Sequence, residues 1–456
     1  MEPKEKVLKR STRYLMFVLI CLINSYCGLS GSVLSSFSQT IKKELNISDT
    51  QFGSFGSILG MGNVFGSLVY SLISGSISRK FLFIFSIGFY SLSHLIFVIT
   101  TNYKLIIAIR FLSGTSQVIG YCYFPCWVDQ FAIFKHKETM MTILNLSGNL
   151  GMIWGYLLGI FFDDSNWKFS FICELVAMYI CLISLIFIPG EFFNNKYFNK
   201  KNDNDNNREQ DSIFMMIKIK KDEVEKSDEK TNNIKKPAFL IYLTNPEFIL
   251  MLLFKANFFF ICIAELFWYG DHLVEVYNCN DNTQKFYSYT LSLVISSIIG
   301  GMLSGIVTSF LGGSSSKKGM ISLLICHGIS IIIGIITPYQ KNIKLFTVFN
   351  SLFSLFNSWS GNFAINMAIV SLPNELKGNA IGFFMFCMQW MAFFPGPIVF
   401  ACIKSYYSSS IIALKFLFFY GIIGFICFLM YTILRLNKIT KENKDEKNIP
   451  LKDMTE

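Results

Sequence analysis

Charged residues are scarce in this sequence of 456 residues, at 15% of the chain, where soluble globular proteins carry about 25%. Histidine occurs four times, and no pair has the His-x-x-x-His spacing of a helical zinc site. The sequence also lacks a Gly-x-x-x-x-Gly-Lys-Ser/Thr phosphate loop and a Gly-x-Ser-x-Gly nucleophile elbow. These absences exclude a built-in ATPase and argue against a hydrolase, so we expect no enzyme activity, no cofactor and no metal.

A disulfide framework is also excluded, although the chain has twelve cysteines. Almost all of them lie within apolar stretches, and Cys279 is the clear exception in a loop. Cys122 and Cys126 stand four residues apart, but no histidine or second cysteine pair joins them to complete a metal-ligand set. The cysteines therefore indicate neither a secreted disulfide scaffold nor a metal site.

Apolar residues are abundant instead, at 52% of the chain, with a mean hydropathy of +0.46. They gather in stretches of about 20 residues, the length that crosses about 30 Å of hydrocarbon. We predict an all-α integral membrane protein. The expected spans cover twelve ranges: 14–37, 51–75, 81–100, 105–128, 139–162, 167–189, 247–269, 286–309, 320–337, 345–370, 379–400 and 411–434.

The twelve spans divide the chain into two six-helix bundles, 14–189 and 241–434. A polar, low-complexity linker, 190–240, joins them, and such a composition favours a tether over a folded domain. Residues 1–13 and 435–456 form the tails. The first apolar stretch is about 24 residues long and lacks a small-x-small cleavage site, so we interpret it as a span and not as a cleaved signal.

Lysine and arginine are distributed unequally between the two sides of these spans. The side that holds both tails and the linker carries 29 of the 40 basic residues, against 9 on the other side, and Arg110 and Lys255 lie within or at the edge of spans. Without the long linker the ratio is still 18 to 9. The positive-inside rule therefore predicts cytosolic termini. The net charge of +10 reflects topology, so we expect the lipid bilayer and no nucleic acid as partner.

A short basic loop follows an even-numbered span in each bundle. Span 2 runs into "GSISRKF" (75–81) and span 8 into "GIVTSFLGGSSSKKG" (305–319), so both place glycine and then two cations before the next span. Two bundles that echo each other are typical of secondary transporters, in which the substrate site lies near the midplane between the halves.

The segments "LNISDTQFGSFGSILGMGNVFGSLVYSLISGSISRK" (45–80) and "IRFLSGTSQVIGY" (109–121) resemble the first half of a major facilitator superfamily transporter. In that family a Gly-x-x-x-Asp-Arg-x-Gly-Arg-Lys loop follows span 2. Gly75, Arg79 and Lys80 match this loop, while Ser78 stands at or near the acidic position, which puts the family's salt bridge there in question. The resemblance implies twelve helices in two pseudo-symmetric six-helix bundles.

Two further segments resemble particular branches of that superfamily. "FPCWVDQFA" (124–132) and "LPNELKGNAIGFFMFCMQWMAFFPGPIVF" (372–400) look like the spinster-type and organic-anion-type branches, which carry lysolipids, sphingolipids or amphipathic anions. A competing resemblance is to protist amino-acid transporters. Either implies a small-molecule substrate, and in this superfamily spans 1, 4, 7 and 10 line the central cavity.

Span 4 places Arg110, Gly114, Gln117 and Tyr121 on one helix face, because they follow the spacing i, i+4, i+7 and i+11. A guanidinium binds carboxylate or phosphate through two parallel hydrogen bonds. We therefore predict that Arg110 anchors an anionic group, with Gln117 and Tyr121 beside it. The alternative is a cation that reaches the headgroups or forms a structural pair.

Glu265 lies deep within span 7, where burial favours gain and loss of a proton near neutral pH. We predict a role in proton coupling or in contact with a cationic group. The alternative is a structural partner, either Arg110 or Lys255. Asp271 and His272, near the end of the same span, are expected to be solvated.

Other polar residues within spans complete the predicted pocket. Asn24 in span 1 and Asn357 and Trp359 in span 10 are expected to contact substrate, although amides also join helices to one another. Glu174 in span 6 is expected to face lipid. His94 in span 3 is interpreted as a lone polar residue and not as a proton relay.

Glycine and proline predict where the helices move. Small residues let helix backbones approach closely, and we expect such seams where the two halves rock against each other. The seams consist of Gly56, Gly60, Gly62 and Gly66 in span 2 and Gly148, Gly151, Gly155 and Gly159 in span 5. Pro395 and Pro397 remove two backbone donors from span 11, which predicts a kink that bends as a gate.

These observations together predict a monomeric multi-pass transporter that works by alternating access. The expected solute is a small amphipathic anion or lysolipid-like molecule, with protons as the coupling ion. An amino-acid transporter of the same fold is the alternative, and a non-transporting membrane receptor or scaffold is an alternative from another class. The sequence does not indicate whether the membrane is the plasma membrane or an organelle membrane.

Overall fold

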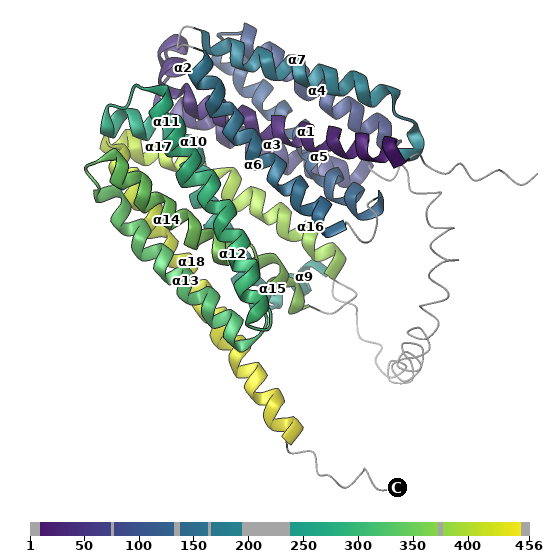
Figure 1. Ribbon diagram of the computed structural model, residues 1–456, viewed down its shortest axis with the longest axis vertical. Helices are drawn as coiled ribbons and strands as arrows, with labels where there is room; N and C mark the ends of the chain where they lie inside the picture. Colours follow the sequence, from purple (N-terminus) through teal and green to yellow (C-terminus); the bar gives the residue numbers. More distant parts are fainter. Residues whose placement is uncertain are drawn as a thin grey trace, which may run out of the picture.

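The computed structural model describes residues 10–73, 77–131, 137–162, 166–193, 238–372 and 377–447. Every regular element within these ranges is helical (Figure 1). The N-terminal half consists of α1 (Arg10–Ser36), α2 (Ser38–Leu45), α3 (Asp49–Ile73), α4 (Arg79–Ile99), α5 (Tyr103–Phe131), α6 (Lys137–Phe161), α7 (Trp167–Phe187) and η3 (Gly190–Phe192).

The C-terminal half begins with the described part of the chain that follows the linker. It consists of α9 (Ala238–Thr244), α10 (Pro246–Tyr277), α11 (Asn282–Tyr289), η5 (Thr290–Ile295), α12 (Ser296–Phe310), α13 (Lys317–Ile336), η6 (Thr337–Tyr339), α14 (Ile343–Gly361), α15 (Ala364–Val370), α16 (Lys377–Met388), η8 (Gln389–Phe393), α17 (Pro395–Tyr407) and α18 (Ser410–Lys447). Most of the predicted linker and the ends of both tails lie outside the described residues.

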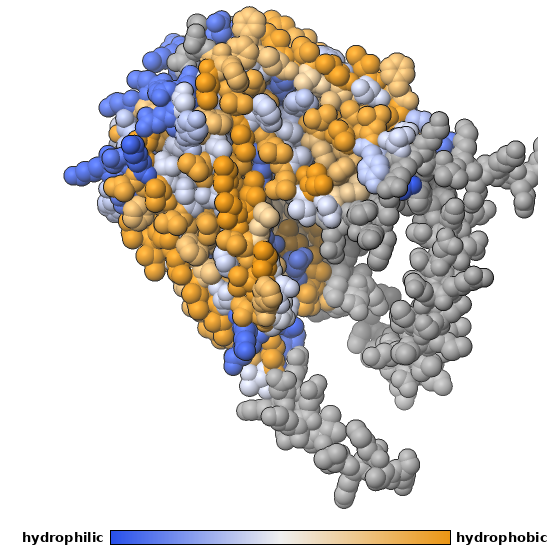
Figure 2. Space-filling view, viewed as in Figure 1, coloured by the Kyte–Doolittle hydropathy of each residue, from blue (hydrophilic) through white to orange (hydrophobic). Residues whose placement is uncertain are grey.

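Eleven of the described helices, or runs of helices, are long and apolar enough to cross a membrane. The expected span 345–370 is not among them. The structure divides it into α14 and α15 with a break at Asn362 and Phe363, and α14, at 19 residues, is long enough to cross but not apolar enough. These two helices occupy the place of the twelfth span. The predicted all-α membrane architecture is confirmed, and the surface seen in Figure 2 is mostly apolar, as contact with lipid requires.

The two halves each have their own internal packing. α1 packs on α6, and α3 and α4 pack on α5, whereas α10 packs on α18, and α12 and α13 pack on α14. We name the side where α1 begins and α18 ends the termini face. The far face is the opposite side, which carries α2, α11 and the turn between α17 and α18 at the upper left of Figure 1.

Three clusters of buried apolar side chains show how the halves meet. The first joins both halves near the far face, where Phe52 of α3 packs against Phe267 and Trp268 of α10. The second lies within the N-terminal half alone, around Trp127, and the third lies within the C-terminal half alone, around Phe428. The halves therefore share one core toward the far face and have separate cores toward the termini face.

Glycines of α3 allow the close approach of the two halves. A Cβ atom added to Gly60 would lie 2.8 Å from the backbone of Phe393 in η8, and one added to Gly53 would lie 2.6 Å from the Cβ of Ala401 in α17. The predicted contact of the span-2 glycines with the other half is confirmed for Gly56 and Gly60, while Gly62 and Gly66 pack on α5 of the same half.

The glycines of α6 lie elsewhere than expected. A Cβ atom added to Gly151 would lie 1.8 Å from the carbonyl oxygen of Ser25, and one added to Gly155 would lie 2.0 Å from the Oγ of Ser32. Both contacts are with α1 of the same half, so the expectation that this seam lies between the halves is wrong. The reason is that α6 packs mainly on α1 of its own half.

Span 11 is interrupted at the place where the sequence predicts a kink. α16 ends at Met388, the π-helical turn η8 follows, and α17 begins at Pro395. Proline lacks the backbone N–H that would continue the ladder, so the helix interrupts its regular hydrogen bonds just before Pro395. A gating role for Pro395 and Pro397 stays a prediction.

Candidate functional site

A network of charged side chains joins the two halves at the far face. α10 is 32 residues long, so at about 1.5 Å per residue Asp271 lies about 38 Å from the first residue of the helix. Its Oδ1 atom accepts hydrogen bonds from Lys42 of α2, at 2.5 Å, and Gln39, at 2.7 Å. Its Oδ2 atom forms an ion pair with Lys404 of α17. The side chain of Asp271 has no exposed surface.

Two further carboxylates complete this network. Asp49 at the start of α3 lies 2.7 Å from Lys42 and 3.3 Å from Lys404, and Glu275 of α10 lies 2.7 Å from Lys404. We name the five residues Lys42, Asp49, Asp271, Glu275 and Lys404 the far-face lock. A buried charge is tolerated only where partners compensate it, and here Asp271 has one cation from each half.

The expectation that Asp271 and His272 are solvated is wrong. Both are buried, and the Nδ1 atom of His272 lies 2.7 Å from the Oγ of Ser410. The charged partners of Asp271 come from α2 and α17, which are more than a hundred residues away on either side. Hydropathy along span 7 therefore gave no sign that these residues are enclosed.

Aromatic side chains close the same region beneath the far-face lock. The rings of Tyr156 in α6 and Tyr289 in α11 stack with centroids 3.7 Å apart. The hydroxyl of Tyr156 lies 2.7 Å from the Oγ of Ser35, and a Cβ atom added to Gly270 would lie 2.2 Å from the carbonyl oxygen of Ser35. Two tyrosines and one glycine thus bring α1 and α6 against α10 and α11.

Arg110 lies inside the N-terminal half, with 3% of its surface exposed. Its guanidinium carbon lies 4.7 Å from the centre of the Phe97 ring on α4. The Nε and Nη2 atoms are buried and have no hydrogen-bond partner. The structure therefore places two unused donors of a permanent cation in the interior of the bundle.

The neighbours predicted on the same face of α5 adjoin one another. Gln117 donates a hydrogen bond of 2.8 Å to the hydroxyl of Tyr121 and one of 3.4 Å to the carbonyl of Cys27 on α1. The Oε1 atom of Gln117 is buried without a partner, whereas Tyr121 is 36% exposed. A line of polar groups thus leads from an exposed phenol toward Arg110.

Asn24 joins α1 to α6. Its Nδ2 atom donates hydrogen bonds to the carbonyl of Leu144, at 2.9 Å, and to the Oγ of Ser147, at 3.0 Å. This geometry matches the alternative in which amides hold helices together.

Glu174 and His94 were underestimated from the sequence. The expectation that Glu174 faces lipid is wrong, because 2% of its surface is exposed and Tyr90 donates a hydrogen bond of 3.3 Å to its Oε1 atom. His94 is not a lone polar residue, since its Nε2 atom lies 2.8 Å from the Oγ of Ser30 and 3.8 Å from Oε1 of Glu174. The sequence did contain a signal for this grouping. His94, Arg110 and Glu174 lie five to seven residues from the far-face ends of α4, α5 and α7, so they are at similar depths in the bundle.

Glu265 is buried in the C-terminal half with a partner that was not expected. Asn350 of α14 donates a hydrogen bond of 2.6 Å to its Oε1 atom. The suggested partners lie elsewhere. Arg110 is in the other half, and Lys255 donates to the carbonyl of Gly361, at 2.7 Å, with its nitrogen near the rings of Phe258 and Phe259. Lys255 thus caps the end of α14, where the negative end of a helix dipole favours a cation.

Asn357 and Trp359 of α14 have unused polar atoms. The Nδ2 atom of Asn357 lies 3.7 Å from the sulfur of Cys262, and its Oδ1 atom is buried without a partner. The indole nitrogen of Trp359 is also buried without a partner. Nearly all buried polar groups in proteins are hydrogen-bonded, so these atoms are candidates for contact with a solute.

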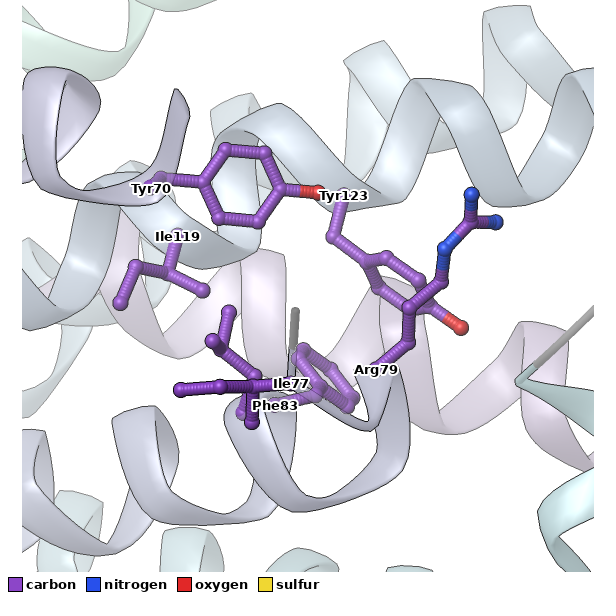
Figure 3. Close-up of a pocket in the computed structure, with 7 residues that line it drawn as sticks. Tyr70, Ile77, Arg79, Phe83, Ile119 and Tyr123 are labelled. Carbon is purple, nitrogen blue, oxygen red and sulfur yellow. The ribbon is translucent and has the colours of Figure 1, made fainter. Parts of the chain in front are cut away.

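Lys80, in the basic loop 75–81 that leads into α4, binds the end of another helix of the N-terminal half. Lys80 donates to the carbonyls of Ile186, at 2.8 Å, and Ile188, at 2.6 Å, at the end of α7. Arg79 lies beside Tyr123, with its guanidinium pointing away from Phe83, at the edge of a hollow with room for about one water molecule (Figure 3). Gly75 lies outside the described residues, and gating by this loop stays a prediction.

A second ion pair at the far face lies wholly within the N-terminal half. Burial alone would raise the pKa of Glu44 on α2, but the hydrogen bonds from Lys168 and Trp167, each 2.5 Å long, outweigh burial and hold that pKa below its ordinary value. This pair fixes α2 to the start of α7. Among the described residues no group of three side chains is arranged to bind a metal ion.

A family model decides the relationship that this architecture suggests. The model of the Major Facilitator Superfamily matches residues 18–397. The chain belongs to the Major Facilitator Superfamily. The resemblance seen in the sequence is thereby confirmed.

Curated relatives within the superfamily match parts of the chain. Putative polyol transporter 1 of Arabidopsis thaliana is 22% identical over 176 residues, which are 38% of this chain and 34% of the relative. Sugar transporter ERD6-like 16 of the same plant is 26% identical over 196 residues, 41% of this chain and 39% of the relative. The chain thus matches about a third of the length of these relatives.

Solved structures match nearly the whole chain. A bacterial homolog of the human lysosomal transporter Spinster, in an inward-facing and unoccupied conformation, has a TM-score of 0.72 at 11% identity, covering 94% of this chain and 99% of that one. A D-xylose-proton symporter has a TM-score of 0.68 at 12% identity, covering 92% and 97%. The likeness shows the fold, and the predicted similarity to the spinster type is confirmed at that level.

Proposed function

We propose that this chain is a secondary transporter that moves a small organic solute by alternating access. The observation that carries this proposal is the one-sided contact between the halves. A shared core, the far-face lock and the Tyr156–Tyr289 stack join them near the far face, whereas their cores are separate near the termini face. A rocking transporter needs such a contact on one face at a time.

The orientation in the membrane follows from charge. The positive-inside rule places the termini face, with 29 of the 40 basic residues, in the cytosol. The contact between the halves then lies on the outer side, which is the arrangement expected of an inward-facing transporter. The inward-facing conformation of the spinster homolog that it resembles supports this assignment.

The substrate that best suits the site carries an anionic group on an apolar body. Arg110 offers two buried donors without partners, and Gln117, Asn357 and Trp359 offer further unused polar atoms among many aromatic side chains. A guanidinium in a region of low dielectric favours carboxylate or phosphate. Amphipathic anions and lysolipid-like molecules have this chemistry, and amino acids have the charged part of it.

A sugar or polyol is a second candidate. The names of the curated relatives, a polyol transporter and a sugar transporter, favour it. Unpartnered amide and indole groups also suit hydroxyl groups. A neutral solute of this kind would leave the charge of Arg110 unused, which is how the two candidates differ.

Glu265 is the proposed coupling residue. Its carboxylate has one hydrogen bond, from Asn350, and its surroundings include Tyr269, Tyr289 and Cys262. A buried carboxylate with a single donor is stabilised by a proton. A proton there would couple solute movement to a pH gradient.

Uptake into proteoliposomes that hold the purified protein tests the proposal. The solutes are labelled organic anions, lysophospholipids, amino acids, sugars and polyols, each with and without an inward proton gradient. We expect uptake of one anionic class that Arg110→Ala abolishes and Lys104→Ala, an exposed cation on the same helix, leaves intact. Glu265→Gln should keep uptake and lose its response to the gradient.

Two outcomes would contradict parts of this proposal. Uptake of a sugar that is unaffected by Arg110→Ala would overturn the anionic substrate in favour of the second candidate. Movement of none of these solutes by folded protein would overturn transport and favour a receptor or scaffold.

A further inference from the structure

The N-terminal half contains a buried group of titratable side chains that neither the far-face lock nor Glu265 explains. It consists of four residues from α1, α4, α5 and α7, respectively Ser30, His94, Arg110 and Glu174. Each lies seven residues or fewer from the far-face end of its helix. At about 1.5 Å per residue, all four lie about 10 Å or less below that end. Each is at most 4% exposed.

The geometry determines which nitrogen of His94 carries its first proton. The Nδ1 atom lies 3.0 Å from the backbone carbonyl of Tyr90. A carbonyl oxygen only accepts, so Nδ1 must donate and must carry the proton. The Nε2 atom of the neutral ring is then unprotonated and can accept a hydrogen bond. It lies 2.8 Å from the hydroxyl of Ser30 and 3.8 Å from Oε1 of Glu174.

Glu174 lacks the partners that an ionised carboxylate needs. Its Oε1 atom accepts one hydrogen bond, from Tyr90, and its Oε2 atom is buried without a partner. Arg110 is near enough to interact with it electrostatically, but no ion pair joins the two among the described residues. A buried carboxylate without a paired cation costs free energy. One additional proton removes that cost, either by neutralising Glu174 or by converting His94 to an imidazolium beside it.

The other groups that face this pair do not supply the proton or replace it. Cys27 and Ser30 face it from α1, Tyr90 from α4, and Arg110 and Tyr121 from α5. α6 also touches α7, and the hydroxyl of its Tyr156 is held by Ser35. Arg110 is the one permanent cation among these named groups, so its charge is opposed only when the pair gives up its proton.

We infer that His94 and Glu174 together bind one exchangeable proton, at a site separate from Glu265 and in the other half of the molecule. The proton belongs to the pair and not to either residue, as in other closely coupled titrations. With the proton bound, Arg110 is left uncompensated and is available to an anion. Without it, the Glu174 carboxylate opposes that cation from within the bundle.

The link to anion transport rests on the proposed function, but the proton site does not. Its test therefore uses the full protein in lipid nanodiscs without any solute. The side chains of its four histidines carry ¹⁵N, and His94→Gln identifies the His94 signals. The sample is titrated from about pH 4 to about pH 9, which brackets the ordinary pKa values of Glu and His.

At the alkaline end we expect the His94 proton on Nδ1. We also expect the pH at which Nε2 of His94 becomes protonated to shift by about one unit or more in Glu174→Gln. This variant keeps the shape of the side chain and the acceptor for Tyr90. The matched control Glu265→Gln should leave the His94 transition unchanged. If Glu174→Gln does not fold, Tyr90→Phe, which removes the donor to Glu174 and keeps the ring, should displace the same transition.

Three results would overturn the inference: a neutral His94 with its proton on Nε2, a His94 transition indifferent to both Glu174→Gln and Tyr90→Phe, or an equal displacement in Glu265→Gln. If the pair titrates as expected while no solute moves in proteoliposomes, the proposed function fails and the proton site stands.

Discussion

The far face and the termini face of this protein differ in how they hold the two halves together. At the far face, charges from four helices surround one buried aspartate, and aromatic rings from both halves form a single core. Toward the termini face each half has a core of its own. Apolar residues are abundant on both faces, but among the described residues a shared core joins the halves only toward the far face. Contact between the halves therefore depends on particular side chains and not on apolar surface in general.

The largest expected effect comes from Asp271, because it connects both halves. Asp271→Asn leaves Lys42 and Lys404 with fewer opposing charges, and loss of one partner of a buried pair costs about 3–5 kcal/mol. Opening of the far face should increase by more than about a hundredfold. Hydrogen–deuterium exchange of peptides at the far-face ends of α3 and α10 measures it.

Glu275→Gln provides the matched control for that experiment. Glu275 contacts the same Lys404, but 31% of its side chain is exposed, so its pair is worth about 1 kcal/mol or less. Equal exchange in the two variants would mean that the buried Asp271 holds the halves together no more strongly than the partly exposed Glu275 does.

A smaller but specific effect is expected at Gly270. The added methyl group of Gly270→Ala would lie 2.2 Å from the carbonyl oxygen of Ser35 in the other half, and overpacking of this kind costs about 1–3 kcal/mol. Thermal unfolding in detergent should therefore show a lower melting temperature. In Gly305→Ala, where nothing lies within 4 Å of the new methyl group, helix propensity predicts no loss and about 1 kcal/mol of gain.

The aromatic closure is expected to contribute less through its hydroxyl than through its rings. Tyr156→Phe keeps the stack on Tyr289 and removes the hydrogen bond to Ser35, which is worth about 1 kcal/mol. A double-mutant cycle with Ser35→Ala isolates that bond. A coupling energy of zero would show that the two hydroxyls act independently.

The smallest effect is expected where an ion pair lies within one half. The folded state lowers the pKa of Glu44, so its contribution is present above the ordinary pKa of a glutamate and is lost as pH falls through the lowered value. Glu44→Gln should reduce stability slightly at neutral pH and not in acid. Unfolding curves at several pH values would reveal this, and a difference that grows in acid would contradict it.

The sequence predicted the architecture because hydropathy and basic loops are local signals. Span lengths located eleven of the crossing helices, and Pro395 located the interruption of span 11. The break after Gly361 was missed, since nothing in "SGNF" differs from an ordinary polar turn of helix. Spacing along α5 also predicted correctly that Gln117 and Tyr121 adjoin each other.

The site was harder to predict because its contacts join distant parts of the chain. Periodicity on one helix cannot tell which neighbour covers a face, so Glu174 was assigned to lipid and Asp271 to water, although both are buried. Glu265 was placed correctly within the interior, but its partner Asn350 is 85 residues away. Asn24 and the α6 glycines hold α1 and α6 together, a role that polar and small residues share with substrate sites.

The measurement that tests the central claim most directly is a pair of distances across the two halves. Spin labels on encoded unnatural amino acids at Asn46 and Asn280 would report the far face, and labels at Ser78 and Lys317 would report the termini face. In wild-type protein we predict one narrow, short far-face distance and a long termini-face distance. In Asp271→Asn the far-face distance should lengthen while the other shortens. Two distances that stay fixed, or that change in the same direction, would contradict a rocking motion locked at the far face.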